Sequence, residues 1–257
     1  MKIYIGCFNK KSEIDKPGYY SIQLGSANNK NKICKIRDDL GKNISKKNFT
    51  YCELSGLYWI WKNTKDDVIG LVHYRRFFYK NIFTKKSNIL SEDDARKLLN
   101  KYDLIIPEEG LLFNKTIYDQ YKIHHDINDL ELIGTIINEQ CPEYNEAFNK
   151  VINSNYFHPL NMFIGKKYII DEYCQWLFPI LEELENRIDI RKKDKYNQRV
   201  CGFLGERLFN VFIVKNNINF TTLPVYNIEQ SMFKQSIQHC VKRLIKGGVK
   251  KWKNMIT

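Results

Sequence analysis

Short apolar runs and longer amphipathic stretches alternate along the first half of the chain. The runs "KIYIGCF" (2–8), "YYSIQL" (19–24), "VIGLVHY" (68–74) and "DLIIPEEG" (103–110) are rich in β-forming residues and end in polar or turn residues. Stretches with helical spacing lie between them, and one of these begins at Ser91 with acidic residues in its first turn. This alternation predicts an α/β fold with a largely parallel sheet flanked by helices.

The segment 50–63, "TYCELSGLYWIWKN", predicts a helix with a capping box. Thr50 stands at the N-cap position and Glu53 three residues later, which is the reciprocal pattern. Leu54, Leu57 and Trp61 then fall on one face. Capping explains Glu53 without a substrate, so we interpret it as structural, and we expect the tryptophans of this helix to pack in the core.

The second half is predicted to be mainly helical. Residues 117–153 form helices interrupted at Cys141-Pro142, and 168–188 form a long amphipathic helix bent or restarted at Pro179. Between them, "FHPLNMFIGKK" (157–167) predicts a strand with a polar interruption at Asn161. A helix with two glycines is predicted over residues 198–217, and a late strand is predicted over residues 218–229. Without repeats or a linker, residues 1–229 are expected to be one domain.

Residues 230–257 differ in composition and are predicted to form a basic amphipathic C-terminal helix. One helical face collects apolar residues, and Gly247-Gly248 is expected to interrupt the helix before Trp252. Such a helix can lie on an anionic bilayer; the alternative is a helix packed on the domain with a frayed end. The apolar residues are Phe233, Ile237, Val241, Leu244 and Ile245, and the basic ones are Lys234, Lys242, Arg243, Lys246, Lys250, Lys251 and Lys253.

Charge and cysteine content indicate which kinds of partner and which compartment to expect. The 41 Lys and Arg exceed the 29 Asp and Glu, giving a net charge of +12 that favours nucleic acid, phosphorylated small molecules or an anionic membrane as partner. Nucleic acid is disfavoured because no recognised binding motif is present. Seven cysteines without a C-x-x-C pair indicate free thiols in a reducing cytoplasm. The sequence shows neither a secretory signal nor an apolar run of membrane-spanning length.

The strongest chemical signal is "GLVHYRRFF" (70–78), an apolar strand that ends in His73, Tyr74, Arg75 and Arg76. In α/β sheets, ligands bind at the carboxyl ends of strands. Two guanidiniums with an imidazole can neutralise a diphosphate without a metal and can stabilise the charge of a diphosphate leaving group. The alternative is a pair of solvated surface arginines, which the apolar residues on both sides disfavour.

Three other polar residues are candidates for substrate chemistry. Glu206, between Gly205 and Arg207, is the leading candidate for a catalytic base, with an ion-paired surface glutamate as the alternative. His125 follows another histidine, and adjacent side chains on a helix diverge, so the pair is a poor zinc motif; His125 either meets the substrate or is structural. The Asn161 amide could bind sugar hydroxyls or a loop.

Several long blocks in fixed order give the sequence a resemblance to bacterial capsular-polysaccharide and lipopolysaccharide glycosyltransferases that share the domain of unknown function numbered 4422. The blocks are "NISKKNFTYCELSGLYWIWKN" (43–63), "VIGLVHYRRFF" (68–78), "YNEAFNKVINS" (144–154), "NMFIGKKYIIDEYCQWLFPILEELENRIDI" (161–190) and "RVCGFLGERLFNVFI" (199–213). The resemblance implies a GT-A-like, Rossmann-related fold and transfer of a sugar, in some members galactofuranose, from a nucleotide diphosphate donor.

The resemblance also suggests further substrate-binding residues. Relatives carry an "ATHK"-like stretch where this chain has "GCFNK" (6–10), so the family's His is missing while Lys10 matches its Lys. "SIQLGSA" (21–27) stands where relatives have a Gln and Gly pair. The candidates added on this basis are Lys10, Gln23 and Gly25. Asn43 and Ser45, in the polar lead-in to the helix at 50–63, and Arg199 and Arg207, in the segment that contains Glu206, are further substrate-binding candidates.

The resulting hypothesis is a hexosyltransferase that uses a UDP-sugar donor and a lipid-linked or oligosaccharide acceptor. The candidates for the transferred sugar are galactofuranose and galactose. Many GT-A enzymes hold a divalent metal with an Asp-x-Asp pair where this chain has His73-Tyr74-Arg75. No metal or other cofactor is therefore predicted, although the sequence leaves room for a divalent ion. The expected location is the inner face of the cytoplasmic membrane. A non-catalytic scaffold and a nucleic-acid-binding module are the alternatives.

Overall fold

A mostly parallel sheet forms the centre of the molecule. The computed structural model describes the backbone of residues 1–256 and the side chains of residues 1–245. Within this part, nine strands join one sheet, whose main path runs β10-β6-β9-β4-β1-β2-β3, with β5 pairing to β4 and β11 to β5. The strands are β1 (Lys2–Cys7), β2 (Tyr19–Gln23), β3 (Ile36–Arg37), β4 (Val68–His73), β5 (Arg76–Phe78), β6 (Leu104–Pro107), β9 (Phe163–Lys166), β10 (Phe220–Leu223) and β11 (Val225–Asn227).

Strand directions bring several chain segments to one edge of the sheet. β3, β2, β1 and β4 run parallel, and β10 is parallel to β6. β9 is antiparallel to both β4 and β6, so those two strands point the same way. The carboxyl ends of β1, β2, β4, β6 and β10 therefore share an edge, where side chains and loops can build a ligand site. The predicted α/β fold with a largely parallel sheet is confirmed.

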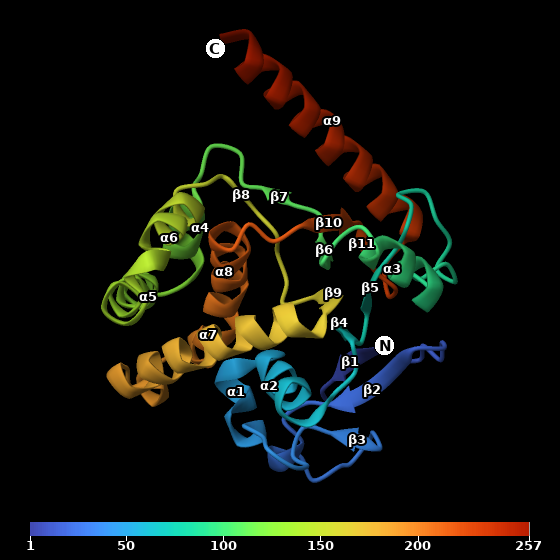
Figure 1. Ribbon diagram of the computed structural model, residues 1–257, viewed down its shortest axis with the longest axis vertical. Coiled ribbons are helices and arrows are strands. Elements are labelled where there is room, and N and C mark those ends of the chain that lie inside the picture. The colour runs from blue at the N-terminus through green and yellow to red at the C-terminus, as the bar shows by residue number, and fades with distance from the viewer. Residues whose placement is uncertain (257) are drawn as a thin grey trace.

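Helices cover the sheet, and Figure 1 shows α4 to α6 as a separate group at one side and α9 extending away from the body. The short strands β7 (Gly110–Leu111) and β8 (Tyr156–Phe157) form a second small sheet. The helices are α1 (Asn48–Tyr51), α2 (Leu54–Asn63), α3 (Glu92–Leu99), α4 (Ile117–His124), α5 (Ile127–Gln140), α6 (Asn145–Ile152), α7 (Lys167–Arg187), α8 (Val200–Lys215) and α9 (Met232–Ile256).

The alternation of side chains along β1 supplies both faces of the sheet with core residues. Tyr4 packs into the cluster formed with α2, α7 and α8, whereas Ile3 and Ile5 pack into the cluster that includes α3. Successive side chains of a strand point to opposite faces, so a strand buried on both sides must be apolar throughout. This burial fixes the register of β1 and β4 and, with it, the position of the residues that follow β4.

The predicted capping box at Thr50 is wrong. Thr50 is buried inside α1, and this helix ends before Cys52, whose φ is 50°. Glu53 takes the N-cap position of α2 without a side-chain capping bond. A non-glycine residue with positive φ is strained and persists only where the surrounding packing holds it. The predicted cap at Ser91, by contrast, is confirmed, because its hydroxyl accepts from Asp94 N at 3.1 Å.

Other boundaries also differ from the predictions. Asn161 precedes β9 and does not interrupt it, because the strand begins at Phe163. The helical region 117–153 has a second break, at His125-Asp126, where the Asp126 side chain caps α5. α7 continues through Pro179. Pro224 divides the expected late strand into β10 and β11.

α9 is one continuous helix from Met232 to Ile256, so Gly247-Gly248 does not interrupt it. Lys246, Lys250, Lys251, Trp252 and Lys253 lie outside the residues whose side chains the structure describes. None of the helices in the described part of the chain combines the length and apolar character required to cross a bilayer.

Candidate active site

A cleft of about 410 Å³ opens at the carboxyl end of β4. β4 runs parallel to β1 and ends at His73, so His73 and the turn that follows lie with the carboxyl ends of the neighbouring strands. α1, the start of α2 and the residue before α8 form the opposite wall. The lining residues are Phe8, Asn48, Phe49, Cys52, Glu53, His73, Tyr74, Arg75, Arg76 and Arg199.

His73 lies at the bottom of this cleft, only 6 % exposed, between a carboxylate and a guanidinium. Its Nε2 lies 3.6 Å from Glu53 Oε1, and its Nδ1 lies 3.4 Å from Arg76 Nη1. Among the described residues, Nε2 has no hydrogen-bond partner. Burial lowers the pKa of His73; Glu53 opposes this shift, and the nearby arginines add to it. The imidazole is therefore neutral at pH 7.

The hydrogen-bond geometry assigns the tautomer of His73. A guanidinium can only donate, so the Nδ1 atom facing Arg76 must be the acceptor. A neutral imidazole carries one proton, which places it on Nε2. Nε2–H is thus a buried donor beside the cleft, and Glu53 at 3.6 Å is too distant to satisfy it. A ligand oxygen in the cleft would supply the acceptor that this donor lacks.

Three arginines give the cleft its positive charge. Arg75 makes an ion pair of 3.5 Å with Glu229 and lies against the Tyr74 ring, while its buried Nε has no hydrogen-bond partner among the described residues. Burial lowers the pKa of Arg76, with Arg75 the next cause, yet an arginine remains a cation. Arg199 Nε donates to Cys52 Sγ at 3.3 Å. The charge arrangement favours an anion with several oxygens.

Glu206 is on α8, close enough to Glu53, Arg76 and Arg199 for their charges to affect it. Burial raises the pKa of Glu206, an effect that these two arginines and the adjacent Arg207 oppose and Glu53 reinforces. Its Oε2 accepts from Arg207 Nη1 at 3.2 Å. A carboxylate whose pKa is moved towards neutrality is suited to proton transfer.

Arg207 and His125 lie in an aromatic wall outside the lining of the cleft. Arg207 is buried, donates to Gln120 Oε1 at 2.7 Å and lies against Tyr121. His125 stacks on Tyr196 and contacts Phe203 at a centroid distance of 4.1 Å. Burial lowers its pKa to about 4, and Arg207 contributes to the shift. These contacts give both residues a role in packing, whereas their predicted role in substrate binding stays a prediction.

A loop assembly at the end of β2 holds Gln23, Gly25, Asn43 and Ser45, none of which lines the cleft. Its centre is the fully buried Asp38 carboxylate, which accepts from Gly25 N at 2.8 Å and from Ser45 Oγ at 2.5 Å. Gly25 has φ 62°, and a Cβ there would come within 2.6 Å of Asn48 Oδ1. Gln23 bonds to the backbone of Asn31 and Ile33, and Asn43 to that of Asp39 and Gly41.

Two remaining candidates are also held by local contacts. Lys10 is exposed and makes ion pairs with Glu13 and Glu229, at 3.6 and 3.7 Å. Glu229 also pairs with Arg75, so Lys10 stands at the rim of the arginine cluster. Asn161 is buried and donates from Nδ2 to the carbonyl of Gly202 at 3.1 Å, which fixes the loop before β9 to α8.

Glu53 lines the cleft, although the sequence pattern predicts it to be a structural capping residue. The T-x-x-E spacing explained it as a cap, and only the break at Cys52 turns it towards His73. Asn48, Phe49 and Cys52 also line the cleft, and the sequence alone does not predict a site role for them. The signal that could have found them is the block 43–63, which contains all four residues and carries part of the family resemblance.

The residues at the end of β4 do not fit a divalent metal. Such ions prefer several carboxylate or carbonyl oxygens, whereas this position offers an imidazole and guanidiniums. The nearby carboxylates, Glu53, Glu206 and Glu229, lie among arginines. Across the part of the chain that the structure describes, no group of three or more His, Cys, Asp or Glu residues is placed to hold a metal ion.

Two comparisons relate the chain to known proteins. The family model described as "Domain of unknown function (DUF4422)" matches residues 2–217. The apo structure of the bifunctional glycosyltransferase WbbM superposes with a TM-score of 0.83 at 28 % identity, over 89 % of this chain and 45 % of that chain. The chain thus spans less than half of WbbM. No curated protein matches the sequence. The likeness confirms the GT-A-like arrangement, and the match over most of its length shows that the chain belongs to the DUF4422 family.

Proposed function

We propose that the protein is a glycosyltransferase that moves a sugar from a UDP-sugar to a growing glycan. The observation that carries this proposal is the cleft at the end of β4, which Arg75, Arg76 and Arg199 line together with His73 and its unsatisfied Nε2–H donor. These groups match the oxygens of a diphosphate. The likeness to WbbM, which is described as a bifunctional glycosyltransferase, supports the same reaction class.

The reaction places the largest change of charge on the leaving group. The bond between the anomeric carbon and the diphosphate oxygen breaks, and its electron pair moves to UDP. Arg75 and Arg76 are fixed beside this position by the turn after β4, and His73 supplies a hydrogen bond without adding charge. Preorganised donors of this kind stabilise developing negative charge. We therefore propose that cationic side chains stabilise the leaving diphosphate, the role that a divalent metal has in many GT-A enzymes.

The acceptor hydroxyl must lose a proton as its oxygen bonds to the anomeric carbon. In an inverting transfer, we assign this proton to the carboxylate of Glu206, which lies within the electrostatic reach of Arg76. Its raised pKa makes it a stronger base than an ordinary glutamate, while Arg207, Arg199 and Arg76 favour its ionised form. The donor sugar proposed from the family resemblance is galactofuranose or galactose, and the acceptor a capsular, lipopolysaccharide or exopolysaccharide glycan.

A peripheral position on the inner face of the cytoplasmic membrane completes the proposal. Phe233, Ile237, Val241 and Leu244 are all exposed on α9 and follow one another at helical spacing. The other side of the helix, through Ser236 and His239, bonds to the protein body. The apolar face therefore points away from the body, and exposed Lys234 lies beside it. This combination suits the interface of an anionic bilayer.

Thermal unfolding and donor hydrolysis test the reaction. UDP is expected to raise the melting temperature, since a ligand that binds the native state stabilises it, while an oligonucleotide of matched charge is not. A panel of UDP-sugars should then reveal one that releases UDP, with the rate retained in excess chelator. Stabilisation by the oligonucleotide alone would support a nucleic-acid-binding module. UDP binding without hydrolysis or transfer would support a scaffold. Activity that is lost completely in chelator and restored by manganese would reject the proposal that cationic side chains replace a metal.

A further inference from the structure

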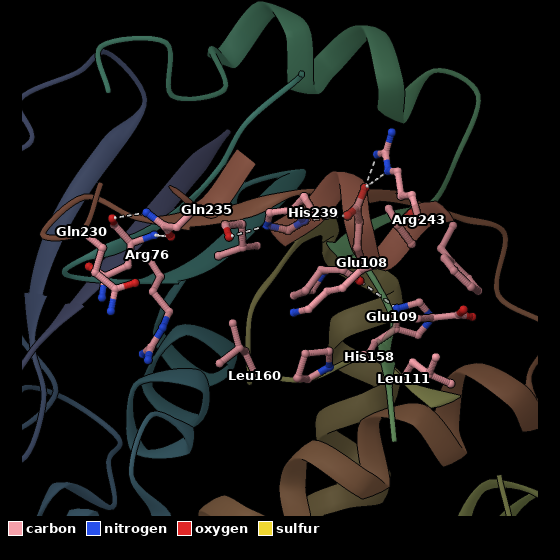
Figure 2. A pocket seen from close by; sticks show the side chains of 18 residues that line it. Arg76, Glu108, Glu109, Leu111, His158, Leu160, Gln230, Gln235, His239 and Arg243 are labelled. Carbon is pink, nitrogen blue, oxygen red and sulfur yellow. Dashed lines mark hydrogen bonds and ion pairs between the residues drawn. The ribbon is translucent and has the colours of Figure 1, made fainter. Parts of the chain in front are cut away.

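A second cavity, of about 510 Å³, lies beside the cleft at the same edge of the sheet. It sits over the carboxyl ends of β6 and β10, and α9 forms part of its wall. Four parts of the chain that are far apart in the sequence meet there: Arg76, 107–111, 158–160, and 220–243, which runs from β10 into the first turns of α9. Figure 2 shows Arg76 on one side of this cavity and Glu108, Glu109 and His158 on the other.

Arg76 belongs to both cavities, so they are neighbouring parts of one site. The loop at 158–161 is anchored to the helix that carries Glu206. Asn210 on α8 accepts from His158 N at 2.8 Å and donates to the carbonyl oxygens of His158 and Glu206, at 3.0 and 2.7 Å. The second cavity is thereby held in a fixed position relative to both Arg76 and Glu206.

The walls of this cavity carry the groups with which proteins bind sugars. Phe220 presents a partly buried ring, and its edge-to-face contact with His158 has a centroid distance of 5.2 Å. His158 Nδ1 donates to the carbonyl of Pro107 at 2.7 Å, and its Nε2 lies 3.7 Å from Glu109 Oε1. Gln230 adds an exposed amide. A flat apolar ring with carboxylate and amide groups around it matches the apolar face and hydroxyls of a pyranose or furanose.

α9 connects this cavity to the proposed membrane surface. Glu108 accepts from Arg243 and faces His239 Nδ1 at 3.0 Å, and these contacts hold α9 against the end of β6. Gln235, His239, Lys242 and Arg243 of α9 line the cavity. The apolar residues of the same helix point away from the body. A bilayer touching that face would place the cavity close to the membrane surface.

We propose that the second cavity is the acceptor site and that it binds the terminal sugar of a membrane-anchored glycan. This inference rests on the proposed glycosyltransferase function and adds the place and chemical class of the acceptor. The donor diphosphate occupies the arginine cleft, the acceptor sugar lies on Phe220, and Arg76 stands where the two meet. The glycan extends from the cavity along α9 towards the lipid.

A pair of substitutions at Gly110 tests the assignment. A Cβ added at Gly110 would meet only Phe157, at 3.8 Å or more, and its backbone does not have a positive φ, so the site accepts a side chain. Gly110→Trp is expected to fill the cavity and Gly110→Ala to leave it open. Binding of octyl galactoside, glucoside, mannoside and N-acetylglucosaminide would be measured by saturation-transfer NMR, alongside UDP binding by calorimetry. We expect Gly110→Trp to weaken glycoside binding by about ten-fold or more, through a steric clash, with UDP binding unchanged.

A second pair tests the aromatic surface without blocking the cavity. Phe220→Leu should weaken glycoside binding about three- to ten-fold, the contribution of an aromatic contact, and Phe220→Tyr should retain it. The acceptor assignment is overturned if wild-type protein binds none of the four glycosides, or if Gly110→Trp, folded and binding UDP normally, binds them as wild type does. Glycoside binding lost in Gly110→Trp would uphold the site even if no UDP-sugar were cleaved, a result that would reject the reaction alone.

Discussion

Glu53 Oε1 lies 3.6 Å from Nε2 of His73, yet burial and three arginines keep this imidazole neutral. The carboxylate and the guanidiniums therefore surround a neutral hydrogen-bond donor. If His73 were protonated, the cleft would gain a fourth cation at the cost of burying it. In the neutral form, Nε2–H can still donate a hydrogen bond to a diphosphate oxygen. This arrangement makes the arginines, rather than His73, the source of positive charge.

The first prediction concerns the affinity for UDP. Arg76→Ala removes a cation that lines both cavities and should weaken UDP binding about ten- to one hundred-fold, the effect of losing a charge-assisted hydrogen bond. Arg76→Lys keeps the charge but loses the planar fork, so an intermediate loss is expected. Isothermal titration calorimetry with UDP measures both. Arg191→Ala, at an exposed position, is the matched control and should bind as wild type does. Equal affinities in all four proteins would contradict the diphosphate assignment.

The second prediction separates catalysis from stability at Glu206. Glu206→Gln should lower kcat for transfer by about one hundred-fold or more, because the acceptor loses its base, while UDP affinity is unchanged. Because the folded-state pKa of Glu206 is raised, its ionisation costs stability once the pH exceeds the unfolded pKa. The neutral variant is therefore expected to melt at a higher temperature than wild type at pH 7. A variant with normal kcat would dismiss Glu206 as the base.

In wild-type protein the same residue should determine the acid limb of the pH–rate profile. The base acts when it is ionised, so kcat/KM should fall as the pH decreases through the raised pKa of Glu206, above the ordinary value of 4.5. Initial rates of UDP release measured across this range give the midpoint. An acid limb at or below the ordinary glutamate value would show that another group accepts the proton.

The third prediction concerns pH and stability through His125. Its pKa is about 4 in the folded protein and about 6.5 when unfolded, so the unfolded chain takes up a proton first as the pH falls. His125 should therefore remove about 2 kcal/mol of stability between pH 7 and pH 5. Urea unfolding of His125→Phe, which keeps the aromatic stack, should lack this loss, whereas exposed His124→Gln should retain it. The same pH slope in all three proteins would contradict this pKa assignment.

The fold and the central cluster could be predicted because their signals are local. An apolar strand that ends in His73 and two arginines shows which residues stand at its carboxyl end, and parallel neighbours place that end at a sheet edge. The helical periodicity of α7 and α8 is likewise contained in short windows. Burial on both faces then leaves the strands little freedom of register.

The remaining site features depend on tertiary packing and could not be predicted from the sequence. The positive φ of Cys52 turns Glu53 from a capping position to the cleft, and nothing in the T-x-x-E spacing signals that strain. Gly25 and Ser45 are predicted to bind substrate, and both bond to Asp38, a residue that no motif singled out. Their part in substrate binding stays a prediction. The second cavity combines four distant segments, so no single window of the sequence describes it.

The last prediction concerns membrane binding through α9. Phe233 and Leu244 are 71 % and 76 % exposed, and they share the face that points away from the body. The double variant Phe233→Ser, Leu244→Ser should reduce binding to phosphatidylglycerol vesicles about one hundred-fold or more, because each apolar side chain contributes about 1.5 kcal/mol or more when buried. Phe113→Ser, which removes an exposed aromatic ring outside α9, should bind as wild type does. Co-sedimentation gives the bound fraction, and added salt should lower it by screening the basic residues. Undiminished binding of the double variant would show that α9 does not dock on lipid, and its apolar face would then require a protein partner.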